Sequence, residues 1–278
     1  MPTIHTRAGR VAYDESGCGP TVFLLHATLH DRRDFDPVRA TLARRYRTVA
    51  IDWPGHGDSD PVGPAFEPGA PLFADVLEDV VDGLGVKRAV LIGNSVGGFA
   101  AARLAITRPA CVAGLILVNT GGFVPLGRTT RAFCRIVGSP VFVRLGAPAF
   151  IRGYMKAKTD SDREIARRAI AAAKTPEGSR TLTGLWRSFA TPEHDLRSRA
   201  AELIAPTLIV WGRNDIAIPL RAGRATHQTI TNSRFEILDT GHVAFSSDPA
   251  GFLAVAEPFL ESVTDVPARH SMDAHQKP

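Results

Sequence analysis

The chain has no long apolar run. None approaches the roughly 20 residues that a membrane-spanning helix needs, and the opening residues MPTIHTR contain no apolar signal segment. Cysteine is scarce, because Cys18, Cys111 and Cys134 are an odd number of thiols without metal-ligand spacing. We therefore expect a cytoplasmic protein with reduced cysteines and no membrane partner, and we expect no export.

Signals for metals, nucleotides and nucleic acids are also missing. No His, Cys and carboxylate residues cluster at ligand spacing, there is no Walker loop, and the glycines of 93–98 lack the dinucleotide spacing and its downstream acidic partner. Helix-turn-helix, zinc and aromatic stacking motifs are absent as well. We predict no metal, no cofactor and no nucleic-acid partner.

What is present is an ordinary composition with an uneven charge. Hydrophobic residues make up 44% of the 278 residues, enough for a substantial core. The net charge is +5, yet residues 121–200 contain 15 Lys and Arg against 6 Asp and Glu. Such a basic run is typical of a solvated helical surface, and it also fits a small-molecule substrate that is anionic or tethered to an acidic carrier. Nothing in the surface pattern predicts an oligomeric state.

Short apolar runs alternate with amphipathic segments through most of the chain, as in a parallel sheet with helices on both faces. The expected strands are 3–7 and 9–15, which form a hairpin, then 21–25, 48–51, 88–92, 114–118, 206–211 and 233–238. The expected helices are 36–45, 72–84, 96–105, 165–174 and 249–263.

The alternation stops after Gly121-Gly122. Residues 123–203 are rich in arginine and helical in character, without a convincing core strand. We predict an α/β core formed by residues 1–122 and 204–265, with a helical cap inserted at 123–203. Residues 266–278 are polar and aperiodic and are expected to form a disordered tail.

The pentapeptide Gly93-Asn94-Ser95-Val96-Gly97 places a serine between two glycines, after a strand pattern and before a helical one. Ser95 is therefore expected on a sharp turn that only glycine neighbours tolerate and that pushes its hydroxyl out above the sheet edge. A helix N-cap serine is the alternative that the pentapeptide alone leaves open.

A serine hydroxyl needs an adjacent base to act as a nucleophile, and histidine is the natural base near neutral pH. Of the nine histidines, His242 follows the strand end and turn at 238–241, which would hang it over the same sheet edge. The imidazole needs an acceptor to set its tautomer, and Asp215 lies just beyond the strand that ends at Trp211. The alternative for Asp215 is a turn or N-cap carboxylate.

Four motifs together resemble the α/β-hydrolase superfamily with a cap inserted after the sixth strand. They are Leu25-His26-Ala27-Thr28, Asp52-Trp53-Pro54-Gly55-His56-Gly57-Asp58-Ser59, Gly93-Asn94-Ser95-Val96-Gly97-Gly98, and Gly212-Arg213-Asn214-Asp215 with Gly241-His242. The resemblance covers residues 10–262 apart from the cap, and it implies a mostly parallel central sheet flanked by helices. It implies the catalytic residues Ser95, Asp215 and His242.

The resemblance also implies an oxyanion hole formed by the backbone N–H groups of Val96 and Thr28, although Ala27 stands where relatives usually have glycine. Asn119 follows the sixth strand, where some relatives keep their acid. Asp239 is expected to end its strand. His26 and His56 are expected to support the loops that contain them. His194, between Glu193 and Asp195, is expected to be a solvated surface residue.

These observations predict a serine hydrolase that cleaves a small or medium carboxylic ester, thioester or lactone through an acyl-enzyme on Ser95. The alternatives are a C–C bond hydrolase of ring-fission products, whose dianionic substrates suit an arginine-rich lid, a cofactor-free perhydrolase or haloperoxidase, and a ligand-binding member of the fold that does not catalyse. C–C hydrolases of this kind often carry an aromatic residue after the triad histidine, where this chain has Val243. Candidate residues of an apolar substrate pocket are His26, Asn94, Phe133, Trp186, Phe189 and Val243.

Overall fold

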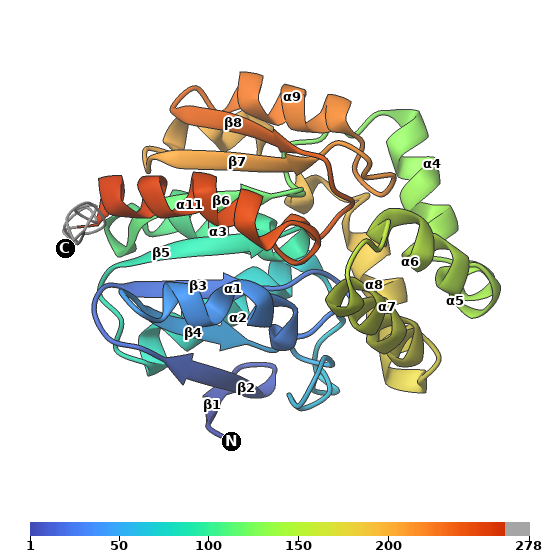
Figure 1. Cartoon of the computed structure of the whole chain (residues 1–278). Helices are drawn as coiled ribbons and strands as arrows, with labels where there is room; N and C mark the ends of the chain where they lie inside the picture. The colour runs from blue at the N-terminus through green and yellow to red at the C-terminus, as the bar shows by residue number, and fades with distance from the viewer. Residues whose placement is uncertain (265–278) are drawn as a thin grey trace, which may run out of the picture.

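A computed structural model describes residues 1–264, so the expected tail at 266–278 lies outside the described residues. Eight strands form one sheet in the order β1-β2-β4-β3-β5-β6-β7-β8 (Figure 1). The strands are β1 (Thr3–Thr6), β2 (Gly9–Ser16), β3 (Thr21–Leu25), β4 (Arg47–Ile51), β5 (Ala89–Asn94), β6 (Val112–Val118), β7 (Thr207–Gly212) and β8 (Ser233–Leu238). Strands β3 to β8 are mutually parallel, whereas β1 and β2 form the expected antiparallel hairpin at one edge. The predicted fold class is confirmed.

The central strands are buried on both faces. Along β3, Phe23 and Leu25 pack into one hydrophobic cluster, whereas Val22 and Leu24 pack into a second cluster on the opposite face, because successive side chains of a strand point to opposite sides. A strand covered on both sides needs apolar residues at every position, so it forms a continuous apolar run in the sequence.

Helices α2 (Ala70–Gly83), α3 (Val96–Thr107) and α9 (Leu220–Thr229) contribute to the first cluster, and α1 (Asp36–Leu42) and α11 (Pro249–Val263) to the second. The expected helix at 249–263 is confirmed to the residue, whereas α9 was not predicted, because it has few apolar residues. Three short helices complete the core: η1 (Arg32–Phe35), η2 (Pro109–Cys111) and α10 (Ala244–Ser247).

Between β6 and β7 the chain forms helices and no strand. They are α4 (Arg128–Val137), α5 (Pro140–Leu145), α6 (Ala147–Met155), α7 (Asp160–Ala173), α8 (Pro176–Ser188), η3 (Pro192–His194) and η4 (Arg197–Glu202). Figure 1 shows α4 to α8 gathered at one side of the sheet. Apolar residues of α5 to α8 belong to the second cluster, so these helices share a core with one face of the sheet. None of the described helices is long and apolar enough to cross a membrane.

Candidate active site

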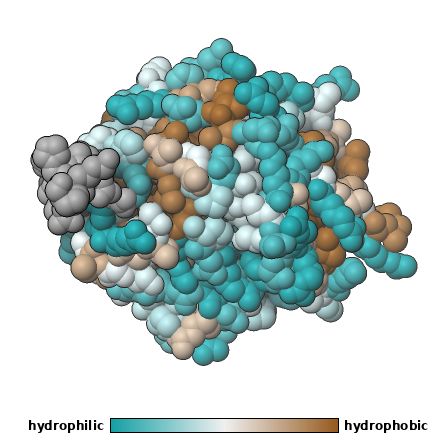
Figure 2. All heavy atoms as spheres, in the orientation of Figure 1, coloured by the Kyte–Doolittle hydropathy of each residue, from teal (hydrophilic) through white to brown (hydrophobic). Residues whose placement is uncertain are grey.

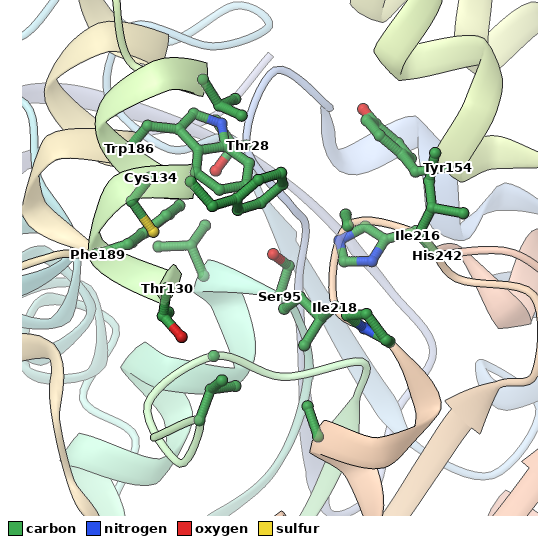
Figure 3. Close-up of a pocket in the computed structure, with 18 of the residues that line it drawn as sticks. Thr28, Ser95, Thr130, Cys134, Tyr154, Trp186, Phe189, Ile216, Ile218 and His242 are labelled. Carbon is green, nitrogen blue, oxygen red and sulfur yellow. The ribbon is translucent and has the colours of Figure 1, made fainter. Parts of the chain in front are cut away.

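The turn between β5 and α3 carries Ser95. Its backbone has φ 57° and ψ −113°, a conformation that side chains rarely adopt. The flanking glycines give it space, because a Cβ on Gly93 would lie 2.4 Å from the Gly97 carbonyl oxygen, and one on Gly97 would lie 2.3 Å from that of Leu25. Ser95 stands at the N-cap position of α3, yet its side chain makes no cap hydrogen bond. The hydroxyl projects into a pocket instead (Figure 3), which favours a nucleophile over an N-cap serine.

His242 and Asp215 are in direct contact. The imidazole Nδ1 lies 2.6 Å from Asp215 Oδ2, and both side chains are buried. With a carboxylate facing Nδ1, the proton of the neutral imidazole lies on Nδ1, and Nε2 is left as the acceptor. Asp215 Oδ1 also accepts the backbone N–H groups of Ala217 and Ile218, at 2.8 and 3.2 Å. The carboxylate therefore both organises its turn and orients the imidazole, and His242 lines the same pocket as Ser95.

Asn119 holds Asp215 from the neighbouring strand. Its Nδ2 donates to Asp215 Oδ2 at 2.6 Å, and its Oδ1 accepts the Gly212 N–H at 3.0 Å. Its φ of 43° is one that asparagine tolerates better than most residues. The sequence identified this position only as one without a carboxylate. The structure gives it a clear role, which is to hold the carboxylate that β7 supplies.

The predicted oxyanion donors, Thr28 and Val96, both line the pocket. Val96 is the first residue of α3, so its N–H has no partner within the helix. Leu29 has a φ of 67°, whereas Ala27 does not have a positive φ, so alanine is accommodated where relatives usually have glycine. The Thr28 hydroxyl is buried without a hydrogen-bond partner among the described residues, which leaves it free to act as a further donor.

His26 and His56 connect the loop that contains Thr28 with the loop after β4, so His56 supports a neighbouring loop rather than only its own. His56 Nε2 accepts the Leu29 N–H at 2.9 Å, and His26 Nε2 accepts the Trp53 N–H at 3.0 Å. Burial lowers the pKa of both His26 and His56 to about 3. Both rings therefore stay neutral and keep Nε2 as an acceptor at ordinary pH.

A cavity of about 580 Å³ lies between the cap and the carboxyl ends of the parallel strands (Figure 3). Its cap side is mostly apolar, with polar groups from Thr129, Thr130, Tyr154 and His194. The apolar residues there are Leu126, Phe133, Cys134, Val137, Phe142, Ala147, Phe150, Ile151, Leu182, Trp186 and Phe189. Among the lining residues in the described part of the chain, Arg221 alone carries a permanent charge, and it belongs to α9 rather than to the cap. The basic residues of the cap therefore do not line the cavity.

The expected pocket residues divide into two groups. Phe133, Trp186 and Phe189 line the cavity, whereas His26, Asn94 and Val243 are fully buried outside its lining. Asn94 instead donates from Nδ2 to the carbonyl oxygens of Val118 and His242, both at 3.0 Å. Its side chain thus connects the Ser95 turn to the backbone of the candidate base.

The prediction for His194 was wrong. Its side chain is 8% exposed and lies between the rings of Phe99 and Phe189, with centroid distances of 4.7 and 4.9 Å. Burial lowers its pKa to about 4. The charged neighbours Glu193 and Asp195 suggested solvent, but the short helix η3 turns only the intervening side chain inward, where it lines the cavity.

A polar network between cap and core escaped sequence analysis, and we call it the cap latch. It consists of Tyr154 and Arg168 from the cap with His30, Asp31 and Asp34 from the core. Arg168 donates to Asp31 Oδ2 and Asp34 Oδ1 at 3.0 and 2.9 Å, and His30 Nδ1 contacts the Asp34 carboxylate. His30 Nε2 lies 2.9 Å from the Tyr154 hydroxyl.

The cap latch reaches the candidate base through Tyr154. The Tyr154 carbonyl accepts the His242 N–H at 2.9 Å, and the two rings meet edge to face at a centroid distance of 5.3 Å. Burial raises the pKa of the Tyr154 hydroxyl, which therefore stays protonated. The contact between Tyr154 and His30 joins residues 124 positions apart, so no local pattern in the sequence could reveal it.

Comparison with known proteins supports a hydrolase. The model of a family described as "Alpha/beta hydrolase family" matches residues 22–255. An uncharacterized protein of Mycobacterium tuberculosis is 29% identical over 98% of this chain and 83% of its own length. A 2-hydroxy-6-oxononadienedioate/2-hydroxy-6-oxononatrienedioate hydrolase of Pseudomonas putida is 30% identical over 91% of this chain and 90% of its own. A thermophilic esterase from Thermogutta terrifontis has a similar fold, with a TM-score of 0.80, 24% identity and coverage of 95% of this chain and 98% of its own.

Proposed function

The chain belongs to the alpha/beta hydrolase family, and from this premise we propose that it is a serine hydrolase of carboxylic esters, thioesters or lactones with a small or medium apolar group. One observation carries the proposal: Asp215 engages Nδ1 of His242 at 2.6 Å, which leaves Nε2 as a base in the cavity that the Ser95 hydroxyl enters. A nucleophile needs this combination of base and orienting acid.

The proposed reaction has two halves. The Ser95 oxygen attacks the carbonyl carbon while its proton passes to His242 Nε2, and the leaving alcohol, thiol or ring oxygen then takes that proton as the C–O or C–S bond breaks. Water attacks the acyl-enzyme with the same base, and the proton returns to Ser95. The N–H groups of Val96 and Thr28 would stabilise the oxyanion in both halves, each by roughly 3 kcal/mol.

The cavity supports an apolar substrate better than a dianionic one. C–C hydrolysis, the activity in the name of the Pseudomonas putida relative, could use the same three residues. The dioate in that name, however, carries two carboxylates, and among the described lining residues Arg221 alone offers a fixed positive charge. Val243 also stands where such hydrolases often have an aromatic residue. We therefore expect no turnover of a vinylogous 1,5-diketone, followed by its absorbance, under conditions where simple esters are cleaved.

The test compares wild type, Ser95→Ala and Ser198→Ala on p-nitrophenyl acetate and butyrate. Ser198 is an exposed cap serine and serves as the matched control. We expect kcat to fall by at least about 10³-fold in Ser95→Ala, no change in Ser198→Ala, and fluorophosphonate labelling that is lost only with Ser95. Turnover that survives Ser95→Ala would refute the proposal. If wild type cleaves no ester, thioester or lactone, the fold serves here as a binding protein.

A further inference from the structure

Exposed apolar side chains concentrate on the first two helices of the cap. Seven large apolar residues are exposed in the described chain, and four of them lie on α4 and α5. These four form what we call the α4–α5 patch: Phe133, Ile136, Val141 and Leu145. In Figure 2 brown spheres interrupt the teal surface along the edge of the molecule where Figure 1 places these helices. An exposed group of this kind commonly marks an interaction surface.

The charge around the patch is of one sign. Residues 121–159 contain five Arg, two Lys and no Asp or Glu. Arg128, Arg135 and Arg144 are exposed on α4 and α5. Within the described residues none of these three makes an ion pair, whereas on α7 Arg163 and Arg167 each pair with a carboxylate one turn away. Part of the surplus basic charge of the cap therefore lies beside the apolar patch without an ion-pair partner among the described residues.

The patch continues into the cavity. Phe133 is both exposed and part of the cavity lining, and its ring contacts Phe150 and Trp186 at centroid distances of 6.2 and 5.6 Å. Phe142, which follows the exposed Val141, lines the cavity and contacts Phe150 at 5.8 Å. The aromatic side chains of the cavity lining therefore begin at the α4–α5 patch, and Ser95 lines the same cavity.

We propose that the α4–α5 patch binds the surface of an anionic lipid membrane, with its apolar side chains inserted among the acyl chains and its arginines on the headgroups. Short helices that combine exposed apolar residues with Lys or Arg bind membrane interfaces in this way without spanning them. A second copy of this chain is a poorer occupant, because a two-fold contact would bring the same unpaired arginines face to face. Such surface binding needs no spanning helix, and it departs from the expectation of no membrane partner, which rested on the lack of long apolar runs.

The test is vesicle flotation of the full chain and of variants outside the cavity lining. We expect wild type to bind phosphatidylcholine vesicles that contain phosphatidylglycerol at low salt. Binding should be at least about tenfold weaker without phosphatidylglycerol or at high salt. Leu145→Glu should weaken binding by about tenfold or more, whereas Ile204→Glu, which changes a similarly exposed residue at 67% against 71%, should bind like wild type.

Two double variants test the contribution of the arginines to vesicle binding. Arg135→Gln/Arg144→Gln should lose about tenfold in affinity, whereas Arg163→Gln/Arg167→Gln should lose little, because those arginines are already paired. Unchanged hydrolysis of water-soluble p-nitrophenyl butyrate by all variants would show that they are folded.

Three results would overturn the inference. The first is a failure of the wild type to bind the anionic vesicles. The second is binding by Leu145→Glu that is as tight as that of the wild type. The third is a wild-type dimer in solution that Leu145→Glu converts to a monomer. Vesicle binding needs no catalysis, so a protein that binds vesicles but cleaves no ester would refute the proposed function and leave this inference standing. A protein that cleaves esters but does not bind vesicles would refute this inference and leave the proposed function standing. If the protein takes esters dissolved in the membrane into its cavity, it needs both the membrane binding inferred here and the proposed hydrolase activity.

Discussion

At the level of single residues, the site depends on one carboxylate whose place is set by two strands. Asp215 follows β7, and Asn119, which follows β6, donates to its Oδ2 at 2.6 Å. The two side chains are therefore near enough for a charge to be moved from one to the other. Asp215 Oδ2 contacts both this amide and the His242 imidazole, so moving the carboxylate to position 119 tests whether the acid orients the imidazole or only holds the turn.

We expect Asp215→Asn to lower kcat for ester hydrolysis by about 10⁴-fold, since the amide disfavours the tautomer with the proton on Nδ1. Adding Asn119→Asp should recover at least about tenfold, because a carboxylate returns to the side of His242 that Asp215 occupied. Asp239→Asn, which changes an exposed carboxylate close to His242 in the sequence, should leave kcat unchanged. A double variant no better than Asp215→Asn would contradict this view of the acid.

The buried histidines lead to a second prediction, which concerns how the free energy of unfolding depends on pH. Burial lowers the pKa to about 3 for His26 and His56 and to about 4 for His194. All three rings are therefore neutral in the folded protein. In the unfolded chain a histidine binds its proton near pH 6.5. Below that pH the unfolded state binds more protons than the folded state. The free energy of unfolding therefore falls on acidification, down to about pH 3 to 4.

Between pH 7 and pH 5 each of these histidines should cost about 2 kcal/mol of unfolding free energy, in a range where unfolded carboxylates scarcely titrate. Urea unfolding at the two pH values measures the loss. His56→Gln should lose about 2 kcal/mol less than wild type on acidification. His5→Gln, at an exposed position, should behave like wild type. Equal losses in wild type and His56→Gln would mean that His56 does not titrate as described.

Among the secondary-structure elements, α6 and α7 position the cap through the cap latch. Arg168 of α7 bridges two carboxylates that are almost fully buried, Asp31 and Asp34. The preceding residue of the helix, Arg167, pairs with Glu164, whose side chain is 44% exposed. Substituting each arginine therefore compares how much a partly buried ion pair and a surface ion pair of the same helix contribute to stability.

Arg168→Met should lower the free energy of unfolding by about 3 kcal/mol, because two buried carboxylates lose a shared cation. It should also lower kcat, since α6 carries the Tyr154 carbonyl that holds His242. Arg167→Met should cost less than about 0.5 kcal/mol, as surface pairs usually do. Urea denaturation and ester kinetics measure both effects. Equal effects of the two substitutions would exclude a special role for the bridge.

At the level of the whole molecule, cap and core share one hydrophobic cluster. Ile151 and Met155 of α6 and Leu182 of α8 belong to the same cluster as Val210 of β7 and Phe245 of α10. The cap also contributes Leu185 and Leu196 to the first cluster, so it packs on the core rather than folding around a centre of its own. A shared cluster of this kind couples the unfolding of its parts.

Ile151→Ala should lower the midpoint of the whole unfolding transition by an amount that corresponds to about 2–4 kcal/mol, because Ile151 is buried in the shared cluster. Ile136→Ala, at an exposed position of the cap, should not shift it. Calorimetry and far-UV circular dichroism should report one transition for both variants. An early transition of the cap alone, with an unchanged core midpoint, would contradict the coupling.

The fold and the candidate site were predictable to different degrees. The β5–α3 turn follows from Gly93, Ser95 and Gly97, because only glycine fits where a Cβ would touch the neighbouring backbone. The pairing of Asp215 with His242 followed from their places after two strands, since the carboxyl ends of parallel strands meet at one edge. The inward turn of His194 did not follow, because charged neighbours in the sequence say little about which side chain of a short cap helix faces the cavity.

The sequence alone determined what local sterics and periodicity control: continuous apolar runs as buried strands, the glycine-flanked serine, and the break in alternation where the cap begins. The tertiary structure decided which distant groups meet. In it Asn119 contacts Asp215 and Tyr154 contacts His30. Neither Asn94 nor the arginines of the cap line the cavity. The physical reason is that burial and pairing depend on which surfaces pack together across the chain, and no short stretch of residues carries that information.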